Sequence, residues 1–274
     1  MILGEKKNPW WRYIAFALIF CAHFLPFYIL IGVALKSPYD NSSRWIMPGY
    51  IHEENFLTAI ANGKINIAML NSAIITLASV LLVIFLGALA SYPLARKRTK
   101  FNSAVMAFVL GIMMVPPLSI LVPLYSLIAK MGGISTYWGI VLILVTFQLP
   151  TSIFLYSNFI SGIPTALDEA ASIDGCGPFR TFFCIILPQL KPVTASVAIL
   201  TGVFIWNDYQ FSLYLLQSPD MRTVTLSIAS FFSMNSANVN AAAAAALMAI
   251  APVILLFLLL QKYFIKGMVD SAVK

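Results

Sequence analysis

The chain has 274 residues, of which 60% are hydrophobic and only 10% are charged, and its formal net charge is +7. A soluble globular domain carries about 25% charged residues, so this composition excludes an ordinary soluble protein and indicates a polytopic membrane protein. Because Lys and Arg chiefly mark the cytoplasmic side of a membrane protein, the positive charge does not indicate a nucleic-acid partner.

Six apolar segments are long enough to cross the hydrocarbon core of a bilayer, which takes about 20 residues of helix. Their interiors carry no charged side chain, and Asp208 lies near the end of the fifth. The sequence therefore predicts an all-α membrane protein with six transmembrane helices, in which residues 1–274 form a single transmembrane domain. The predicted spans cover about residues 13–35, 67–95, 104–129, 138–160, 193–211 and 241–265.

The distribution of Lys and Arg predicts the orientation of these spans. With the N-terminus inside, twelve of the 17 basic residues fall on the cytoplasmic side, and we expect both termini to be cytoplasmic. The first apolar run is too long for a secretory signal and lacks a small-residue cleavage site, so it is interpreted as a retained helix. The cytoplasmic set is Lys6, Lys7, Arg12, Arg96, Lys97, Arg98, Lys100, Arg180, Lys191, Lys262, Lys266 and Lys274.

Several spans contain residues that affect helix geometry. Proline lacks a backbone donor, so kinks are expected at Pro116-Pro117, Pro150 and Pro252. Such a kink suits either a hinge or a static bend. The alanine run at 241–246 offers a smooth surface for close contact between helices.

The polar stretch "IPTALDEAASIDGCGPF" at 163–179 lies between the fourth and fifth spans and holds three of the ten acidic residues. Pro164 suits the first turn of a helix, and Asp168 and Glu169 suit its positive N-terminal half. Gly175 supplies the left-handed turn that ends a helix, and Pro178 opens a second helix that we expect to run to Pro188. A short polar helix of this kind suits either docking on a cytoplasmic partner or an ordinary position at the membrane surface.

The residues of this stretch match a known pattern. The EAA loop of bacterial ABC importer permeases contains EAA, two further residues and DGA, followed downstream by F, I and LP, and residues 161–188 resemble it. Other segments are similar to the carbohydrate-uptake permeases, in particular to the smaller membrane subunit of the maltose importer. The EAA-like positions are Glu169, Ala170, Ala171, Asp174, Gly175, Phe182, Ile185, Leu187 and Pro188, and the further segments are Asn71-Ser72, "YPLAR" at 92–96, "MMVPP" at 113–117, "VPLY" at 122–125, "WND" at 206–208 and the tail at 261–274.

The resemblance implies a permease subunit of a binding-protein-dependent sugar importer in the bacterial inner membrane. It implies a second permease subunit, expected to form a heterodimer, two cytoplasmic ATPase subunits and an extracytoplasmic substrate-binding protein. The loop at 161–188 would transmit ATP-driven motion to the pore. The implied coupling residues are Asp168, Glu169, Ala170, Ala171, Asp174, Gly175 and Phe182.

The sequence predicts neither an enzyme nor a cofactor site in this chain. It contains no G-x-x-x-x-G-K-[ST] phosphate loop, so ATP is expected on the partner subunit, and it contains no pattern for catalytic or metal-ligating residues. Two alternatives are a permease for another solute such as glycerol 3-phosphate and a secondary transporter. The second fits poorly because such proteins place ionisable residues near the membrane midplane.

Polar side chains on the spans suit a sugar path, since sugar hydroxyls need hydrogen bonds and sugar rings stack on aromatic side chains. Each of them also suits an interhelical hydrogen bond, and a Trp equally suits the membrane interface. The candidates are Asn71, Gln148, Thr151, Asn158, Trp206 and Asn207.

Overall fold

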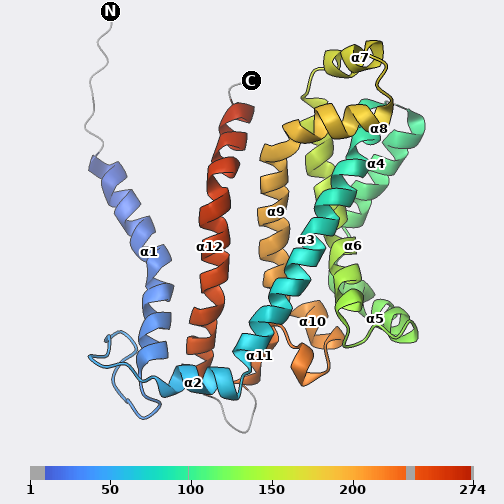
Figure 1. Cartoon of the computed structure of the whole chain (residues 1–274). Helices are drawn as coiled ribbons and strands as arrows, with labels where there is room; N and C mark the ends of the chain where they lie inside the picture. The colour runs from blue at the N-terminus through green and yellow to red at the C-terminus, as the bar shows by residue number, and fades with distance from the viewer. Residues whose placement is uncertain (1–9, 98, 233–237, 273–274) are drawn as a thin grey trace, which may run out of the picture. The chain divides into compact units, whose positions relative to one another are not determined.

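The computed structural model describes residues 10–97, 99–232 and 238–272, and the regular structure within these residues is helical (Figure 1). Five of the described helices are long and apolar enough to cross a membrane, and a bent pair, Lys100–Met113 with Pro117–Lys130, makes a sixth candidate span. The described chain forms two compact units, one of residues up to 65 with 228–250, and one of residues 66–227 with 251 onward. The expected single domain over 1–274 stays a prediction.

The smaller unit is held together by asparagine side chains at the end of its first helix. The last carbonyls of an α-helix have no partner within the helix. Asn55 Nδ2 donates to the carbonyls of Ala34 and Lys36 at 2.8 and 2.7 Å, and Asn240 Nδ2 donates to those of Val33 and Lys36 at 3.0 and 2.9 Å. The elements are α1 (Trp10–Leu35), α2 (Glu54–Ala61) and the first part of α12 (Val239–Ala272).

The alanine run of α12 packs closely against α1, as its small side chains predict. Ala243 and Ala244 form a buried cluster with Ala34 of α1. The interface is therefore built from methyl groups, which let two helix backbones approach each other.

The larger unit is organised around α6, the most deeply buried of the candidate spans. Leu144 and Tyr156 of α6 share one apolar core with Val83 of α3 and Val197 of α9. Helices α7 and α8 lie at one end of α3 and α6 in Figure 1, and helices α5 and α10 lie at the other end. The elements are α3 (Ile65–Arg96), α4 (Lys100–Met113), η1 (Pro117–Ile120), α5 (Leu121–Lys130), α6 (Tyr137–Ser161), α7 (Ala166–Ile173), α8 (Pro178–Thr181), η2 (Phe182–Ile186), η3 (Leu187–Leu190), α9 (Lys191–Trp206), α10 (Gln210–Leu215), η4 (Pro219–Met221), α11 (Val224–Ser230) and the rest of α12.

The third expected span, 104–129, is broken rather than merely kinked. Helix α4 ends at Met113, and the helical path resumes at Pro117 after a bend of 94°. Two adjacent prolines cause the break: Pro116 is extended, with φ −62° and ψ 127°, as expected for a residue that precedes a proline.

The fifth expected span, 193–211, differs from the structure at both ends. The helix opened by Pro178 does not stop at Pro188, because a π-helical turn (η2) and a 3-10 turn (η3) continue it into α9. At the other end α9 stops at Trp206. Asp208 accepts hydrogen bonds from the backbone N–H of Ser212 at 2.9 Å and from its hydroxyl at 2.7 Å, and so caps the next helix, α10.

Candidate functional site

The polar stretch after α6 forms α7, an eight-residue helix with Asp168 and Glu169 in its first turn. Acidic side chains are favourable there because the helix N-terminus carries a partial positive charge. The helix begins two residues after Pro164, with Thr165 at its N-cap, so Pro164 precedes the first turn instead of lying in it.

Gly175 ends α7 in the way that the sequence predicts. Its φ is +75°, in the left-handed region that is costly for residues with a side chain. The N–H of Cys176 donates to the carbonyl of Ala171 at 2.8 Å, and the N–H of Gly175 donates to that of Ser172 at 3.1 Å. This pair of hydrogen bonds is the Schellman arrangement, which satisfies the last carbonyls of the helix.

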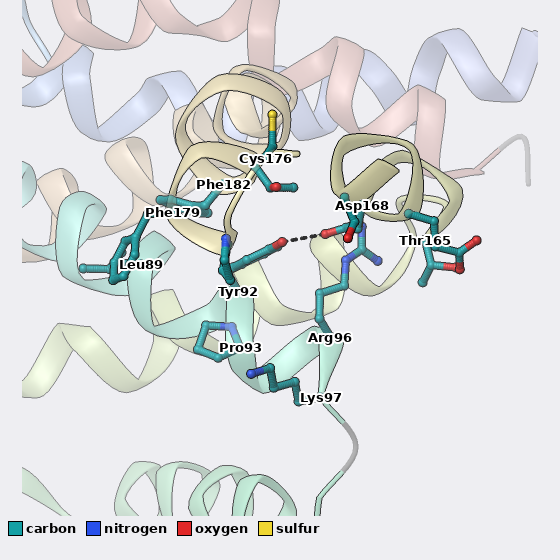
Figure 2. Close-up of a pocket in the computed structure, with 14 residues that line it drawn as sticks. Leu89, Tyr92, Pro93, Arg96, Lys97, Thr165, Asp168, Cys176, Phe179 and Phe182 are labelled. Atoms are coloured by element: carbon teal, nitrogen blue, oxygen red, sulfur yellow. Dashed lines mark hydrogen bonds and ion pairs between the residues drawn. The ribbon is translucent and has the colours of Figure 1, made fainter. Parts of the chain in front are cut away.

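Asp168 connects α7 to the C-terminal end of α3. The Tyr92 hydroxyl donates to Asp168 Oδ1 at 2.6 Å, and Arg96 Nη2 lies 2.8 Å from Asp168 Oδ2. Figure 2 shows Tyr92 and Arg96 reaching from α3 toward the carboxylate. We call these three residues, Tyr92, Arg96 and Asp168, the α7 clamp. Tyr92 and Arg96 are four residues apart, and the helical repeat places both on the same face of α3.

Arg96 also holds the end of α6. Its Nη1 donates to the carbonyl of Ile160 at 3.1 Å and to that of Ile163 at 2.8 Å. These carbonyls lie in the last turn of α6 and just after it, where positive charge is favourable. One guanidinium therefore joins α3, to which Arg96 belongs, to the end of α6 and to α7.

A cavity of about 650 Å³ lies beside the clamp. The Tyr92 and Phe182 rings pack against each other on one side, with centroids 5.3 Å apart. Figure 2 shows Phe179 and Leu89 on the same side as these rings, and Asp168 and Thr165 on the other. The cavity is therefore bounded by rings on one side and by the first turn of α7 on the other.

The seven predicted coupling residues separate into two groups. Asp168 is half-buried, and Ala171 and Phe182 are buried against the rest of the unit. The remaining four are exposed, namely Glu169, Ala170, Asp174 and Gly175. Two large apolar side chains that were not among the predicted site residues, Ile173 and Phe179, are also exposed, at 87% and 74%.

Asn71, a candidate for the sugar path, is instead fully engaged inside the unit. It is 2% exposed, and its Nδ2 donates to the carbonyls of Asp220 and Arg222 at 2.9 and 3.0 Å. Its Oδ1 accepts from the Tyr137 hydroxyl at 2.7 Å. Ser72 accepts from the N–H of Val224 at 2.9 Å. These contacts fasten the loop at 220–224 to the N-terminal end of α3, and both polar atoms of Asn71 have a partner within the unit.

The other five candidates lie on α6 and at the end of α9. Of the six, only Trp206 lines the apolar cavity of about 300 Å³ between α3, α9 and α12, together with Thr76. Gln148 is buried in α6, Thr151 is half-buried, and Asn158 and Asn207 are exposed. A sugar path through these residues stays a prediction.

Tyr92 and Arg96 were not among the predicted site residues, although both lie in the segment "YPLAR" at 92–96. An Arg at the end of an apolar helix, four residues after a Tyr, was the available signal. Among the described residues no group of three or more His, Cys, Asp or Glu side chains forms a candidate metal site.

The class of protein follows from the match of the chain to a family model. Residues 83–270 match the family "Binding-protein-dependent transport system inner membrane component". This match covers more than half of the chain, and the chain therefore belongs to that family of multi-pass cytoplasmic-membrane permeases of ABC importers.

Individual relatives confirm the resemblance to carbohydrate-uptake permeases. The chain is 48% identical over 259 residues, 94% of each chain, to the melibiose/raffinose/stachyose import permease protein MelC of Bacillus subtilis. It is 33% identical over 91% of each chain to the probable starch degradation products transport system permease protein AmyC of Thermoanaerobacterium thermosulfurigenes. A bacterial ABC transporter involved in alginate import has the same fold, with a TM-score of 0.76 at 18% identity, over 96% of this chain and 100% of that one.

Proposed function

We propose that this chain forms half of the pore of a sugar importer and docks α7 on a cytoplasmic ATPase subunit. The observation that carries the proposal is the surface of loop 161–188, where Ile173 and Phe179 are exposed beside the charged Glu169. Exposed apolar side chains rimmed by polar ones are typical of a protein interaction surface. The cluster of basic residues on the same side of the predicted spans supports a cytoplasmic position for this loop and for both termini.

Family membership supports the partners. An importer of this class requires a second permease subunit, two ATPase subunits and an extracytoplasmic binding protein, and the ATP site belongs to the ATPase. A chain that supplies only membrane helices and a docking helix has no means of coupling ATP hydrolysis to transport by itself. Purified alone in liposomes, it should give no ATP-dependent sugar uptake, and uptake without added partners would contradict the proposal.

The substrate proposal rests on the relative with 48% identity. We infer that the importer carries melibiose, raffinose or stachyose, because the relative is named for their import and matches this chain over 94% of its length. The test is uptake of each labelled sugar by the reconstituted importer, with starch-derived maltooligosaccharides as the comparison. Preference for the maltooligosaccharides would overturn this assignment without affecting the permease assignment.

Docking is tested by reversing the charge of Glu169. Glu169→Lys should leave the spans inserted, because the loop bears none of their burial energy, but should abolish recovery of the ATPase subunit in a pull-down. Glu54→Lys is a matched control, since Glu54 is also an exposed first-turn residue of an eight-residue helix, α2. If Glu169→Lys retains the ATPase subunit as the control does, α7 is not the docking helix.

A further inference from the structure

We propose that the α7 clamp makes α7 move as one body with the ends of α3 and α6, and that this fastening transmits ATP-driven motion to the spans. The inference rests on the proposed function, in which α7 docks on the ATPase. It assigns to Tyr92, Arg96 and Asp168 a positioning role distinct from docking. Asp168, which the sequence groups with the docking residues, belongs by its contacts to the interior of the permease.

The guanidinium group of Arg96 joins α3 to both α6 and α7. A planar guanidinium can bond in several directions at once, whereas an ammonium group is a compact point charge. Arg96 uses Nη1 for two carbonyls at the end of α6 and Nη2 for the carboxylate of Asp168. Displacement of α7 relative to α3 would break the ion pair, and displacement of α3 relative to α6 would break the carbonyl contacts.

The ion pair of the α7 clamp is mostly buried. The side chains of Arg96 and Asp168 are only 11% and 20% exposed. An exposed ion pair contributes little because water screens it, but screening is weaker for a pair that is mostly buried. The Tyr92 hydroxyl adds a hydrogen bond to the charged carboxylate, and hydrogen bonds of this kind are stronger than those between neutral groups. The α7 clamp is therefore suited to hold α7 against α3 when a bound ATPase subunit pulls on α7.

The two sides of α7 have different surroundings. Asp168 faces α3, whereas Glu169 and Ile173 are exposed on the surface. The residues that would meet an ATPase subunit are therefore separate from those that fasten α7 to the permease. This separation predicts that docking and coupling can be lost independently.

The experiment uses the complete importer, reconstituted with its partner permease, ATPase and binding protein. Asp168→Asn keeps the size of the side chain and removes its charge. We expect the ATPase subunit to stay bound in a pull-down, while hydrolysis no longer rises when sugar and binding protein are added. Tyr92→Phe, which keeps the ring against Phe182, should reduce the stimulation by less. Lys97→Ala is the control, because it removes a neighbouring cation outside the clamp and should leave the stimulation at the parent level.

A covalent link between positions 96 and 168 provides a second test of the clamp, and this test does not depend on side-chain charge. Arg96→Cys with Asp168→Cys, in a background of Cys21→Ser, Cys176→Ala and Cys184→Ser, should uncouple hydrolysis from sugar. A thiol-specific cross-linker that spans the two positions should restore the stimulation. The same reagent on either single cysteine variant should not.

The outcomes separate the clamp from the docking proposal. Asp168→Asn that couples like the parent, or a cross-linked pair that retains the ATPase subunit without regaining stimulation, would overturn the clamp and leave docking intact. Loss of the ATPase subunit from Asp168→Asn alone would make Asp168 a docking residue and would also overturn the clamp. If the parent never holds an ATPase subunit through loop 161–188, the proposed function itself fails.

Discussion

The two ends of α3 are both fastened by polar side chains, but to different kinds of partner. At the N-terminal end, Asn71 and Ser72 are each 2% exposed and bind backbone groups of the loop at 220–224. At the C-terminal end, Tyr92 and Arg96 bind the half-buried side chain of Asp168 on α7. Helix α3 is thus attached to the loop at 220–224 by neutral hydrogen bonds and to α7 by an ion pair and a hydrogen bond.

The difference indicates what each attachment does. At the N-terminal end, breaking the hydrogen bonds of buried amide and hydroxyl groups would leave unsatisfied groups away from water, so α3 is held to the interior of the unit. At the C-terminal end, a mostly buried ion pair holds α3 to α7, which lies on the exposed loop 161–188. We expect the N-terminal end of α3 to act as a fixed joint and the C-terminal end to be the place where motion enters.

The largest effect is expected from Asn71→Leu. This change keeps the approximate volume of the side chain but removes the three hydrogen bonds of a buried amide, which should lower the free energy of unfolding by roughly 2 to 4 kcal/mol. Denaturant unfolding of the purified chain in detergent would measure it. Asn158→Leu is the matched control, because Asn158 is exposed on α6 and should change stability little. Equal effects of the two substitutions would refute the fixed joint.

A smaller and more local effect is expected from Gly175→Ala. The left-handed backbone at this position costs about 1 to 2 kcal/mol for a residue with a side chain. The added methyl group would meet no atom within 4 Å, so the cost should come from the backbone alone. Hydrogen exchange should quicken at the N–H of Cys176 and stay unchanged at that of Val224. Faster exchange at both sites would show that the two ends of α3 are not independent.

The approximate positions of the long helices, and the turn in loop 161–188, could be predicted from the sequence because local chemistry determines them. The apolar runs place the helices, and Gly175 and Pro178 end one helix and open the next. The break after Met113 and the early end of α9 could not be predicted, since a kinked and a broken helix have the same composition. The cap that Asp208 gives to α10 depends on a contact with Ser212 that only the folded chain shows.

The residues of the candidate site were predicted less well, for a related reason. Composition identifies polar side chains on spans but does not give the direction in which they point. Asn71 suited either a sugar path or an interhelical hydrogen bond, and it binds the backbone of a loop about 150 residues later in the chain. Asp168 was predicted as a coupling residue, and its contact with Arg96 of α3 was not predicted. Both contacts are long-range pairings, which no local pattern encodes.

Ser72→Ala should have a smaller effect than Asn71→Leu on the same joint. It removes a single hydrogen bond, from the N–H of Val224, and should lower the free energy of unfolding by about 1 kcal/mol. Ser103→Ala on the exposed face of α4 is the control for loss of a hydroxyl. Denaturation in detergent again provides the measurement. A Ser72→Ala variant as stable as the control would limit the joint to Asn71.

The smallest effect on stability, and the most selective effect on transport, is expected from Asn207→Ala. Asn207 is exposed at the end of α9, and its Nδ2 bonds only to the nearby Val203 carbonyl at 2.8 Å among its described contacts. Exposed substitutions of this kind usually change stability by less than about 0.5 kcal/mol. If its amide meets the sugar, the ratio of raffinose to melibiose uptake by the reconstituted importer should change.

Asn71→Ala should instead lower uptake of every sugar equally, because it reduces only the amount of folded permease. Gln210→Ala, also exposed and three residues away, should leave both the amount and the ratio unchanged. An unchanged ratio in Asn207→Ala, with normal assembly, would remove Asn207 from the sugar path.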